Sequence, residues 1–205
     1  MSNEQPSHLF VVVSPSGGGK TTLCRQVLER LAPALRFSIS HTTRPPRGEE
    51  RHGVDYYFVG DAEFQRMIDR GELAEWAHVH DRRYGTSRAE IERALADRVD
   101  LLLDIDYQGA EQLAQRYPEA VRVFILPPSM EDLRCRLQGR GTDSPDQVAL
   151  RLAKAREEIR YAARCEFVVV NQDLAVSVRE LEAIIVAQRC RRENRLDAIR
   201  RLDTA

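Results

Sequence analysis

Lysine is nearly absent from this 205-residue chain, although basic residues are not. Of its 31 basic side chains only Lys20 and Lys154 are lysines, which leaves 29 arginines. The 32 acidic residues almost balance them, and the formal net charge is −1. Because a general nucleic-acid binder usually carries a strongly basic face, this balance argues against that class. Any phosphate chemistry is therefore expected to be local.

Cysteines are also few, and they are scattered. Cys24, Cys135, Cys165 and Cys190 form no C-x-x-C pair, and no histidines cluster near them as zinc ligands would. We expect reduced, partly buried thiols. The chain also lacks any run approaching the ~20 apolar residues of a membrane span, and its first residues lack the apolar stretch of a secretory signal. These absences predict a cytoplasmic protein without membrane or nucleic-acid partners.

Apolar runs alternate with helical patterns through most of the chain, which is typical of a parallel sheet covered by helices. The pattern predicts an α/β fold. Strands are expected at 9–13, 101–105, 121–126 and 167–170, and helices at 21–31, 108–115, 130–137, 145–163 and from 176 towards 201. The basic terminal helix could pack on its own core, pair with a second copy or lie in solvent; the sequence predicts no oligomeric state.

The composition and pattern of the sequence change between residues 38 and 88. "RPPRGEERHG" is rich in turn formers and charge, "VDYYFV" predicts a strand, and residues 62–70 predict a short helix. This segment is expected to be an insertion between the first helix and the rest of the core.

The stretch "VVVSPSGGGKTTL" predicts a phosphate-binding loop between a strand and a helix. Gly17, Gly18 and Gly19 let backbone N–H groups converge on an anion, Lys20 adds a charge, and Thr21 offers a hydroxyl to a phosphate-bound Mg²⁺. The usual pattern opens with glycine, where this chain has serine at position 14. Serine is acceptable there if its backbone angles suit an L-residue.

A second Mg²⁺-linked carboxylate is expected at the tip of a neighbouring parallel strand. "LLLDID" places Asp104 and Asp106 at the end of an apolar run, and alternate strand residues share a face. A strand-ending aspartate can instead serve as a helix cap or turn residue.

The inserted segment has residues suited to a second nucleotide. Arg44 and Arg47 flank two prolines, which hold the backbone stiff, and arginine can grasp phosphate oxygens with two nitrogens. Tyrosine hydroxyls could add phosphate contacts. A carboxylate such as Glu75 could accept both the N1–H and the amino group of guanine. Taken singly, these residues could equally be surface charges or strand packing.

A family resemblance joins these motifs. "SHTTRPPR", "GVDYYF", "EWA", "YGTS", "LDID" followed by "QGA", "ILPPS", "GRGTD" and "VVVN" occur in this order, and together they resemble guanylate kinase from about residue 9 to 186. The resemblance implies a P-loop nucleoside-monophosphate kinase: a three-layer fold with a parallel core sheet, an inserted GMP-binding region and a mobile lid. It implies a core formed by residues 1–37, 89–138 and 152–205, a GMP-binding subdomain at 38–88 and a lid at 139–151.

The resemblance also implies the site residues. ATP would be bound by Ser16, Gly17, Gly18, Gly19, Lys20, Thr21, Thr22 and, near the adenine, Asn171. GMP would be bound by Ser40, Arg44, Arg47, Tyr56, Glu75, Tyr84, Thr86 and Asp104, and magnesium by Thr21 and Asp106. The catalytic residues would be Lys20, Arg44, Arg136, Arg140 and Arg151.

Three positions depart from the family's usual pattern. Thr86 stands where serine is common but keeps the hydroxyl, Gln172 interrupts the usual N-D-D run, and Ser14 replaces the first loop glycine. Base recognition is expected to survive the threonine. Any role of the family's residue at position 172 is in doubt.

The lid prediction also has a physical basis. Arg136 and Arg140 lie one helical turn apart, and Gly139 and Gly141 would let the segment swing. Guanidiniums folded over the transferring phosphoryl group would meet the charge on its equatorial oxygens. The arginines could otherwise be helix-surface residues that aid solubility.

The sequence thus predicts an ATP:GMP phosphotransferase of purine nucleotide metabolism, which transfers the γ-phosphoryl group of Mg²⁺-ATP to GMP or dGMP. Two alternatives stay open. One is a non-catalytic guanylate-kinase-like module that binds proteins, although the intact Lys20 and Thr21 disfavour it. The other is a kinase of the same fold for another acceptor, such as a ribose bisphosphate, which would give Glu75 no base edge to bind.

Overall fold

The computed structural model describes residues 7–79, 81–139 and 144–203. A five-stranded sheet forms its centre, with all strands parallel in the order β2-β7-β1-β8-β9. These strands are β2 (Leu35–Phe37), β7 (Asp100–Asp104), β1 (Leu9–Val13), β8 (Val121–Leu126) and β9 (Phe167–Val170). Each expected core strand is present within one residue at its ends; β2 was not expected.

Helices cover both faces of this sheet because successive residues of its strands point to opposite sides. Phe10 and Val12 of β1 pack with α1 (Lys20–Leu31) and α7 (Leu174–Arg189). Leu9, Val11 and Val13 pack on the other face with α3 (Arg88–Ala96), α4 (Tyr107–Arg116) and the 3-10 turn η1 (Tyr161–Arg164). This is the predicted three-layer α/β architecture, and it brings the carboxyl ends of β1 and β7 side by side.

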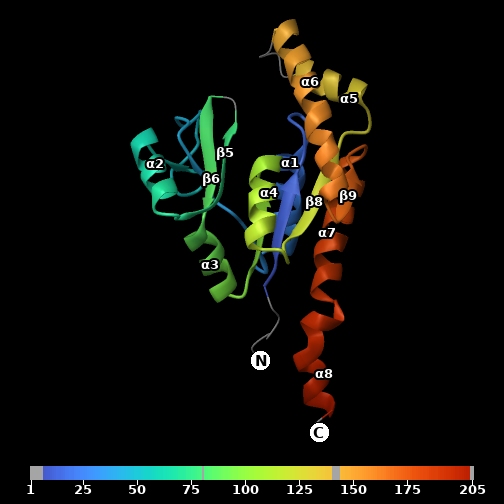
Figure 1. Cartoon of the computed structure of the whole chain (residues 1–205). Helices are drawn as coiled ribbons and strands as arrows, with labels where there is room; N and C mark the ends of the chain where they lie inside the picture. The colour runs from blue at the N-terminus through green and yellow to red at the C-terminus, as the bar shows by residue number, and fades with distance from the viewer. Residues whose placement is uncertain (1–6, 80, 140–143, 204–205) are drawn as a thin grey trace.

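The inserted segment forms a second sheet, which stands beside the core in Figure 1. Its strand order is β4-β3-β6-β5. The strands are β4 (Tyr57–Phe58), β3 (His41–Thr42), β6 (Arg82–Ser87) and β5 (Leu73–Val79), and α2 (Asp61–Asp69) packs against them. The strand expected over "VDYYFV" is only two residues long, because a tight loop precedes it: the N–H of Gly53 bonds the carbonyl of Tyr56.

Two helices stand at the top of the molecule as drawn in Figure 1. α5 (Met130–Gln138) and α6 (Pro145–Arg160) pack together through Leu133, Leu137, Val148 and Ala155. Ser144 begins α6 with a capping box in which its side chain and that of Gln147 bond each other's backbone N–H. The predicted helix over 145–163 is thus confirmed up to residue 160, after which the chain tightens into η1.

The terminal helix departs from the prediction, which ran it without interruption towards residue 201. α7 ends at Arg189, Arg191 is extended, and η2 (Arg192–Arg195) and α8 (Leu196–Asp203) follow. The side chain of Asn194 donates to the carbonyl of Gln188, a bond that caps α7 at this break. α8 extends away from the sheet (Figure 1), and Leu202 is 82% exposed. None of the helices within the described ranges is long and apolar enough to cross a membrane.

Candidate active site

The glycine loop lies where β1 ends and α1 begins, as the sequence predicts. Gly19 is the N-cap of α1 with φ +89°, and a Cβ built on it would lie 2.4 Å from the side-chain nitrogen of Asn171. Only glycine can therefore occupy this position without moving the loop. Among the described residues the only non-glycine with a positive φ is Arg98, so Ser14 meets the condition set for it.

The loop borders a cavity of about 300 Å³ at the N-terminus of α1. Every residue predicted to bind ATP phosphates lines it, together with Arg151 and Asp106. Backbone N–H groups and the positive end of a helix suit this cavity to an anion. The lining also includes Lys154 and Glu158 of α6, neither of which was predicted.

Both lysines of the chain therefore line one cavity. Lys154 lies 3.9 Å from Glu158, whose other oxygen accepts the backbone N–H of Ser16 at 3.3 Å. Burial raises the pKa of Glu158 above its ordinary value. The scarcity of lysine was a usable signal for Lys154, whereas Glu158 is an unremarkable residue in the sequence and only its position in the fold distinguishes it.

Lys20 is paired with a carboxylate at the tip of β7. Its Nζ lies 2.6 Å from Oδ1 of Asp104 and donates to the carbonyl of Ile105 at 2.7 Å. The hydroxyl of Thr21 donates to Oδ2 of Asp104 at 3.0 Å. The predicted meeting of the two motifs is thus present, with Asp104 as the carboxylate that contacts Thr21.

Asp106 has the helix-cap role that the sequence left open. Its Oδ1 accepts the backbone N–H of Gly109 at 2.8 Å, and its Oδ2 accepts from Gln108 at 3.2 Å. It caps α4 and still lines the loop cavity.

A second cavity, of about 150 Å³, adjoins the first and lies between the core and the inserted sheet. It shares Lys20, Val79 and Asp106 with the loop cavity. Its other lining residues include most of those predicted for GMP: Ser40, Tyr56, Glu75, Tyr84 and Asp104. Two small molecules placed in these cavities would meet at Lys20.

Glu75 and Thr86 face each other across β5 and β6. The hydroxyl of Thr86 donates to Oε1 of Glu75 at 2.7 Å, and Glu75 is only 3% exposed. Burial raises the pKa of Glu75 to about 7, and the bond from Thr86 offsets part of this rise. A buried carboxylate with spare acceptor capacity is suited to a ligand that donates two adjacent N–H groups.

Gly109 is a site residue that sequence reasoning missed. A Cβ built on it would lie 2.2 Å from Oε2 of Glu75, so the carboxylate rests directly on the backbone of α4. The signal available in the sequence was a glycine inside a helical pattern, in the "QGA" motif that follows "LDID".

The two predicted arginines of the insertion are placed differently. Arg44 is buried, and its Nε donates to the hydroxyl of Tyr84 at 3.2 Å. Its guanidinium lies 5.3 Å from the ring centre of Tyr56. Arg47 is exposed. Neither lines the smaller cavity, and Arg44 reaches it through the tyrosines.

The predicted lid is described only in part, because Arg140 lies outside the described residues. Arg136 donates to the carbonyl of Asn171 at 2.7 Å and to that of Gly18 at 3.4 Å. The side chain of Asn171 donates to the same Gly18 carbonyl at 2.8 Å. Arg136 and Asn171 also line a hollow of about 250 Å³ beside Gly19 and Thr22, and Asn171 is the residue that the resemblance places near adenine.

Comparison with known proteins identifies the family. The family model described as guanylate kinase matches residues 6–188. The guanylate kinases of Geobacter metallireducens and Bordetella pertussis are each 49% identical to this chain, over 89% and 93% of its length and 90% and 89% of theirs. A crystal structure of guanylate kinase from Anaplasma phagocytophilum is 32% identical with a TM-score of 0.77, covering 93% of this chain and 90% of that one. This chain therefore belongs to the guanylate kinase family.

Proposed function

We propose that this chain transfers the γ-phosphoryl group of Mg²⁺-ATP to GMP or dGMP, with ATP in the loop cavity and the acceptor in the smaller one. The reaction is that of an ATP:GMP phosphotransferase. One observation supports placing ATP and GMP in these two cavities. The cavities share Lys20, and the smaller cavity, which the glycine loop does not line apart from Lys20, contains the buried Glu75.

Positioning of the two substrates and neutralisation of phosphate charge accelerate the proposed reaction. The acceptor is already an ionised phosphate, so no strong general base is needed. Lys20 would exchange Asp104 for phosphate oxygens, and Arg136 and Arg151 would neutralise charge on the transferring group. Tyr56, Tyr84, Arg44 and Arg47 would hold the acceptor phosphate. Ser40, Glu75 and Thr86 would bind guanine, and Asn171 would lie near adenine.

Magnesium would accompany ATP. The hydroxyl of Thr21 and the carboxylates of Asp104 and Asp106 place hard oxygen atoms at the junction of the cavities, which suits an ion that takes few protein ligands and several from phosphates. When bound, Mg²⁺ neutralises the β- and γ-phosphates. The domain assignment is part of the same proposal: an acceptor subdomain at 38–88, a lid at 139–151, a core from the rest and a cytoplasmic location.

The proposal is tested by offering Mg²⁺-ATP with GMP, dGMP, AMP, UMP or a ribose phosphate and measuring ADP release. We expect turnover with GMP and dGMP and at least a hundredfold lower kcat/KM with the others, because only guanine satisfies Glu75. Preferred turnover of a ribose phosphate would favour the kinase with a sugar acceptor. Binding of GMP without any turnover would favour a non-catalytic module.

A further inference from the structure

Arg44 has little hydrogen-bonding capacity left for a substrate. Of the five N–H groups of a guanidinium, Nε donates to the Tyr84 hydroxyl, and Nη1 donates to the carbonyl of Pro45 at 2.7 Å and to Oε2 of Glu50 at 2.9 Å. Nη2 donates to Oε1 of Glu50 at 2.9 Å, which leaves one Nη2 N–H. A two-nitrogen grip on a phosphate would therefore require this arrangement to break.

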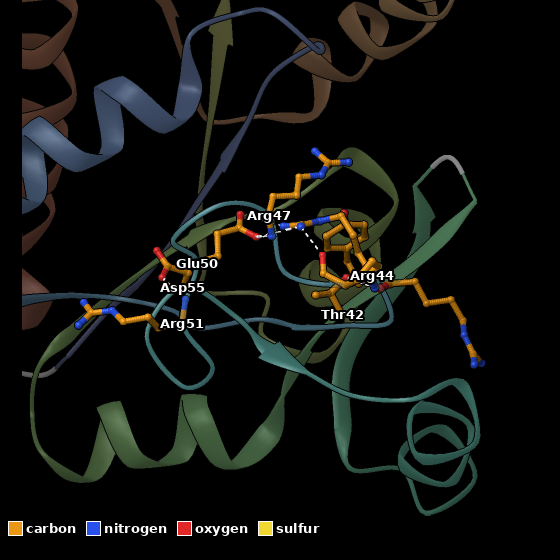
Figure 2. A network of polar contacts seen from close by, with 9 residues as sticks. Thr42, Arg44, Arg47, Glu50, Arg51 and Asp55 are labelled. Atoms are coloured by element: carbon orange, nitrogen blue, oxygen red, sulfur yellow. Dashed lines mark hydrogen bonds and ion pairs between the residues drawn. The ribbon is translucent and has the colours of Figure 1, made fainter. Parts of the chain in front are cut away.

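Glu50 is the centre of this network, as Figure 2 shows. It accepts both terminal nitrogens of Arg44, and its Oε2 also accepts the backbone N–H of Arg47 at 2.8 Å. Hydrogen bonds from Arg44 lower the pKa of Glu50, so it is ionised at neutral pH. Glu50 thus closes the loop that carries both predicted phosphate-binding arginines.

The two edges of the Arg44 guanidinium bond different partners. Glu50 occupies the terminal nitrogens of Arg44, while Nε on the other edge donates to the Tyr84 oxygen. Because that oxygen accepts from Arg44, its own hydrogen is left to donate elsewhere. Tyr84 lines the smaller cavity, so an acceptor there is the available partner.

We propose that Glu50 is a positioning residue for the acceptor phosphate: it holds Arg44 against Tyr84 so that the Tyr84 O–H donates to the phosphate bound in the smaller cavity. This inference rests on the proposed function, since it takes GMP as the occupant of that cavity. The rival is that Glu50 is only a place-holder, an internal anion that GMP phosphate displaces from Arg44. The two ideas predict opposite changes in affinity when Glu50 is neutralised.

Calorimetry with Glu50→Gln separates them, using GMP and guanosine as the two ligands. Guanosine keeps the base but lacks the phosphate, so a defect at the phosphate changes only GMP binding. We expect the Kd for GMP to rise about tenfold, as expected when a charge-assisted hydrogen bond is lost, while the Kd for guanosine stays within twofold. Glu49→Gln, at an exposed neighbouring glutamate, is the matched control and should change neither.

Three outcomes would overturn the proposal: an unchanged Kd for GMP, a lower Kd for GMP as the place-holder rival predicts, or equal weakening of GMP and guanosine, which indicates general loss of structure. Two further variants keep the test decisive if Glu50→Gln folds poorly. Glu50→Asp keeps the charge and should recover part of the GMP affinity. Adding Glu50→Gln to Arg44→Gln should cost nothing more, because the two residues act as one unit. Absence of GMP turnover by the wild-type chain would instead refute the proposed function.

Discussion

At the scale of single residues, two of the cations predicted to contact nucleotide phosphates are already paired with carboxylates of the chain. Lys20 lies 2.6 Å from Asp104, and Arg44 lies 2.9 Å from Glu50. A buried or half-buried cation without a partner is costly, so these pairs keep the site stable before nucleotides bind. We expect the two pairs to respond differently when nucleotides bind. Lys20 has to leave Asp104 to reach a phosphate, whereas Arg44 is proposed to remain paired with Glu50.

Lys20→Ala tests the proposed contact between Lys20 and the transferring phosphate. It should lower kcat by two to three orders of magnitude, because it removes a charge directed at the developing transition state. Steady-state assay with GMP and Mg²⁺-ATP measures this. Lys154→Ala removes the other lysine of the same cavity, where it is 38% exposed, and should cost less than tenfold. Retention of more than about a tenth of wild-type turnover by Lys20→Ala would refute the role.

Gly109→Ala tests the seating of Glu75 on α4. Alanine favours a helix over glycine by about 1 kcal/mol, so stability alone predicts improvement. A Cβ 2.2 Å from the carboxylate must displace it, and we expect the KM for GMP to rise at least tenfold with the KM for ATP unchanged. Gly60→Ala is the control, because nothing lies within 4 Å of its added Cβ. An unaltered KM for GMP in Gly109→Ala would show that the contact does not matter.

Glu75 should also make stability depend on pH. Its pKa is about 7 in the folded chain and ordinarily 4.5, so between these values the folded state holds a proton that the unfolded state has lost. Stability contributed by Glu75 therefore falls as pH rises through this range, by at most about 3 kcal/mol. Glu75→Gln removes the penalty.

Urea unfolding at pH 5 and pH 8 checks this sign. The free energy of unfolding of Glu75→Gln minus that of the wild type should be larger at pH 8 than at pH 5. Glu49→Gln should give the same difference at both values. A gap for Glu75→Gln that is the same at both pH values would mean that the carboxylate is ionised without cost in the fold, and a gap that shrinks as pH rises would mean that the fold favours the ionised form; either result would contradict the raised pKa.

At the scale of elements, α4 holds the free edge of β5. Arg116 donates to the carbonyls of Leu73 and Ala74, each at 2.6 Å. The amide of Gln112 donates to the carbonyl of Trp76 at 2.6 Å and accepts its N–H at 3.2 Å, as a neighbouring strand would. These bonds fix the strand that carries Glu75 to a helix of the core.

Gln112→Ala should therefore loosen the acceptor site without touching substrate. Because both backbone groups of Trp76 lose their partner, we expect about 1–3 kcal/mol less stability and a severalfold higher KM for GMP. Thermal unfolding and steady-state assay measure the two effects. Gln115→Ala lies on the same helix with an exposed side chain and should alter neither. A normal KM for GMP despite lower stability would separate this contact from substrate binding.

The core elements could be predicted because each buries one continuous apolar run or stripe. The hairpin of β5 and β6 and the helix α3 were not predicted. β5 includes the buried Glu75, and in the polar "RYGTS" of β6 Tyr84 lines the smaller cavity while Thr86 bonds Glu75, so these roles hide the strand pattern. The break after α7 was not predicted because it depends on a hydrogen bond from the Asn194 side chain to the carbonyl of Gln188, and the sequence pattern does not indicate this bond.

The candidate site was predicted where residue type and motif order are distinctive. Lys20, Glu75, Thr86 and Tyr84 stand in motifs whose chemistry is readable, and the structure brings them together. Glu50 and Gly109 were missed for a physical reason. Glu50 is distinguished by its hydrogen bonds to Arg44 and Arg47, and Gly109 by its closeness to Glu75. Residue type indicates neither contact, because a glutamate in a charged loop and a glycine in a helix are both common.

At the scale of the whole molecule, the acceptor sheet and the α5–α6 pair stand at different places around the core in Figure 1, and both contribute residues to the loop cavity. α6 contributes Arg151, Lys154 and Glu158 to that cavity, and the acceptor sheet contributes Val79. Both units therefore line the loop cavity. We propose that the two nucleotides bind with their phosphates facing each other at Lys20, and that Glu75 recognises guanine.

The most direct test is calorimetric comparison of GMP with IMP, which lacks only the 2-amino group, for the wild type and Glu75→Gln. We expect the wild type to bind GMP at least tenfold more tightly than IMP, because IMP lacks one of the two N–H donors for the buried carboxylate of Glu75. In Glu75→Gln this ratio should fall towards one. Equal discrimination between GMP and IMP by both proteins would contradict it.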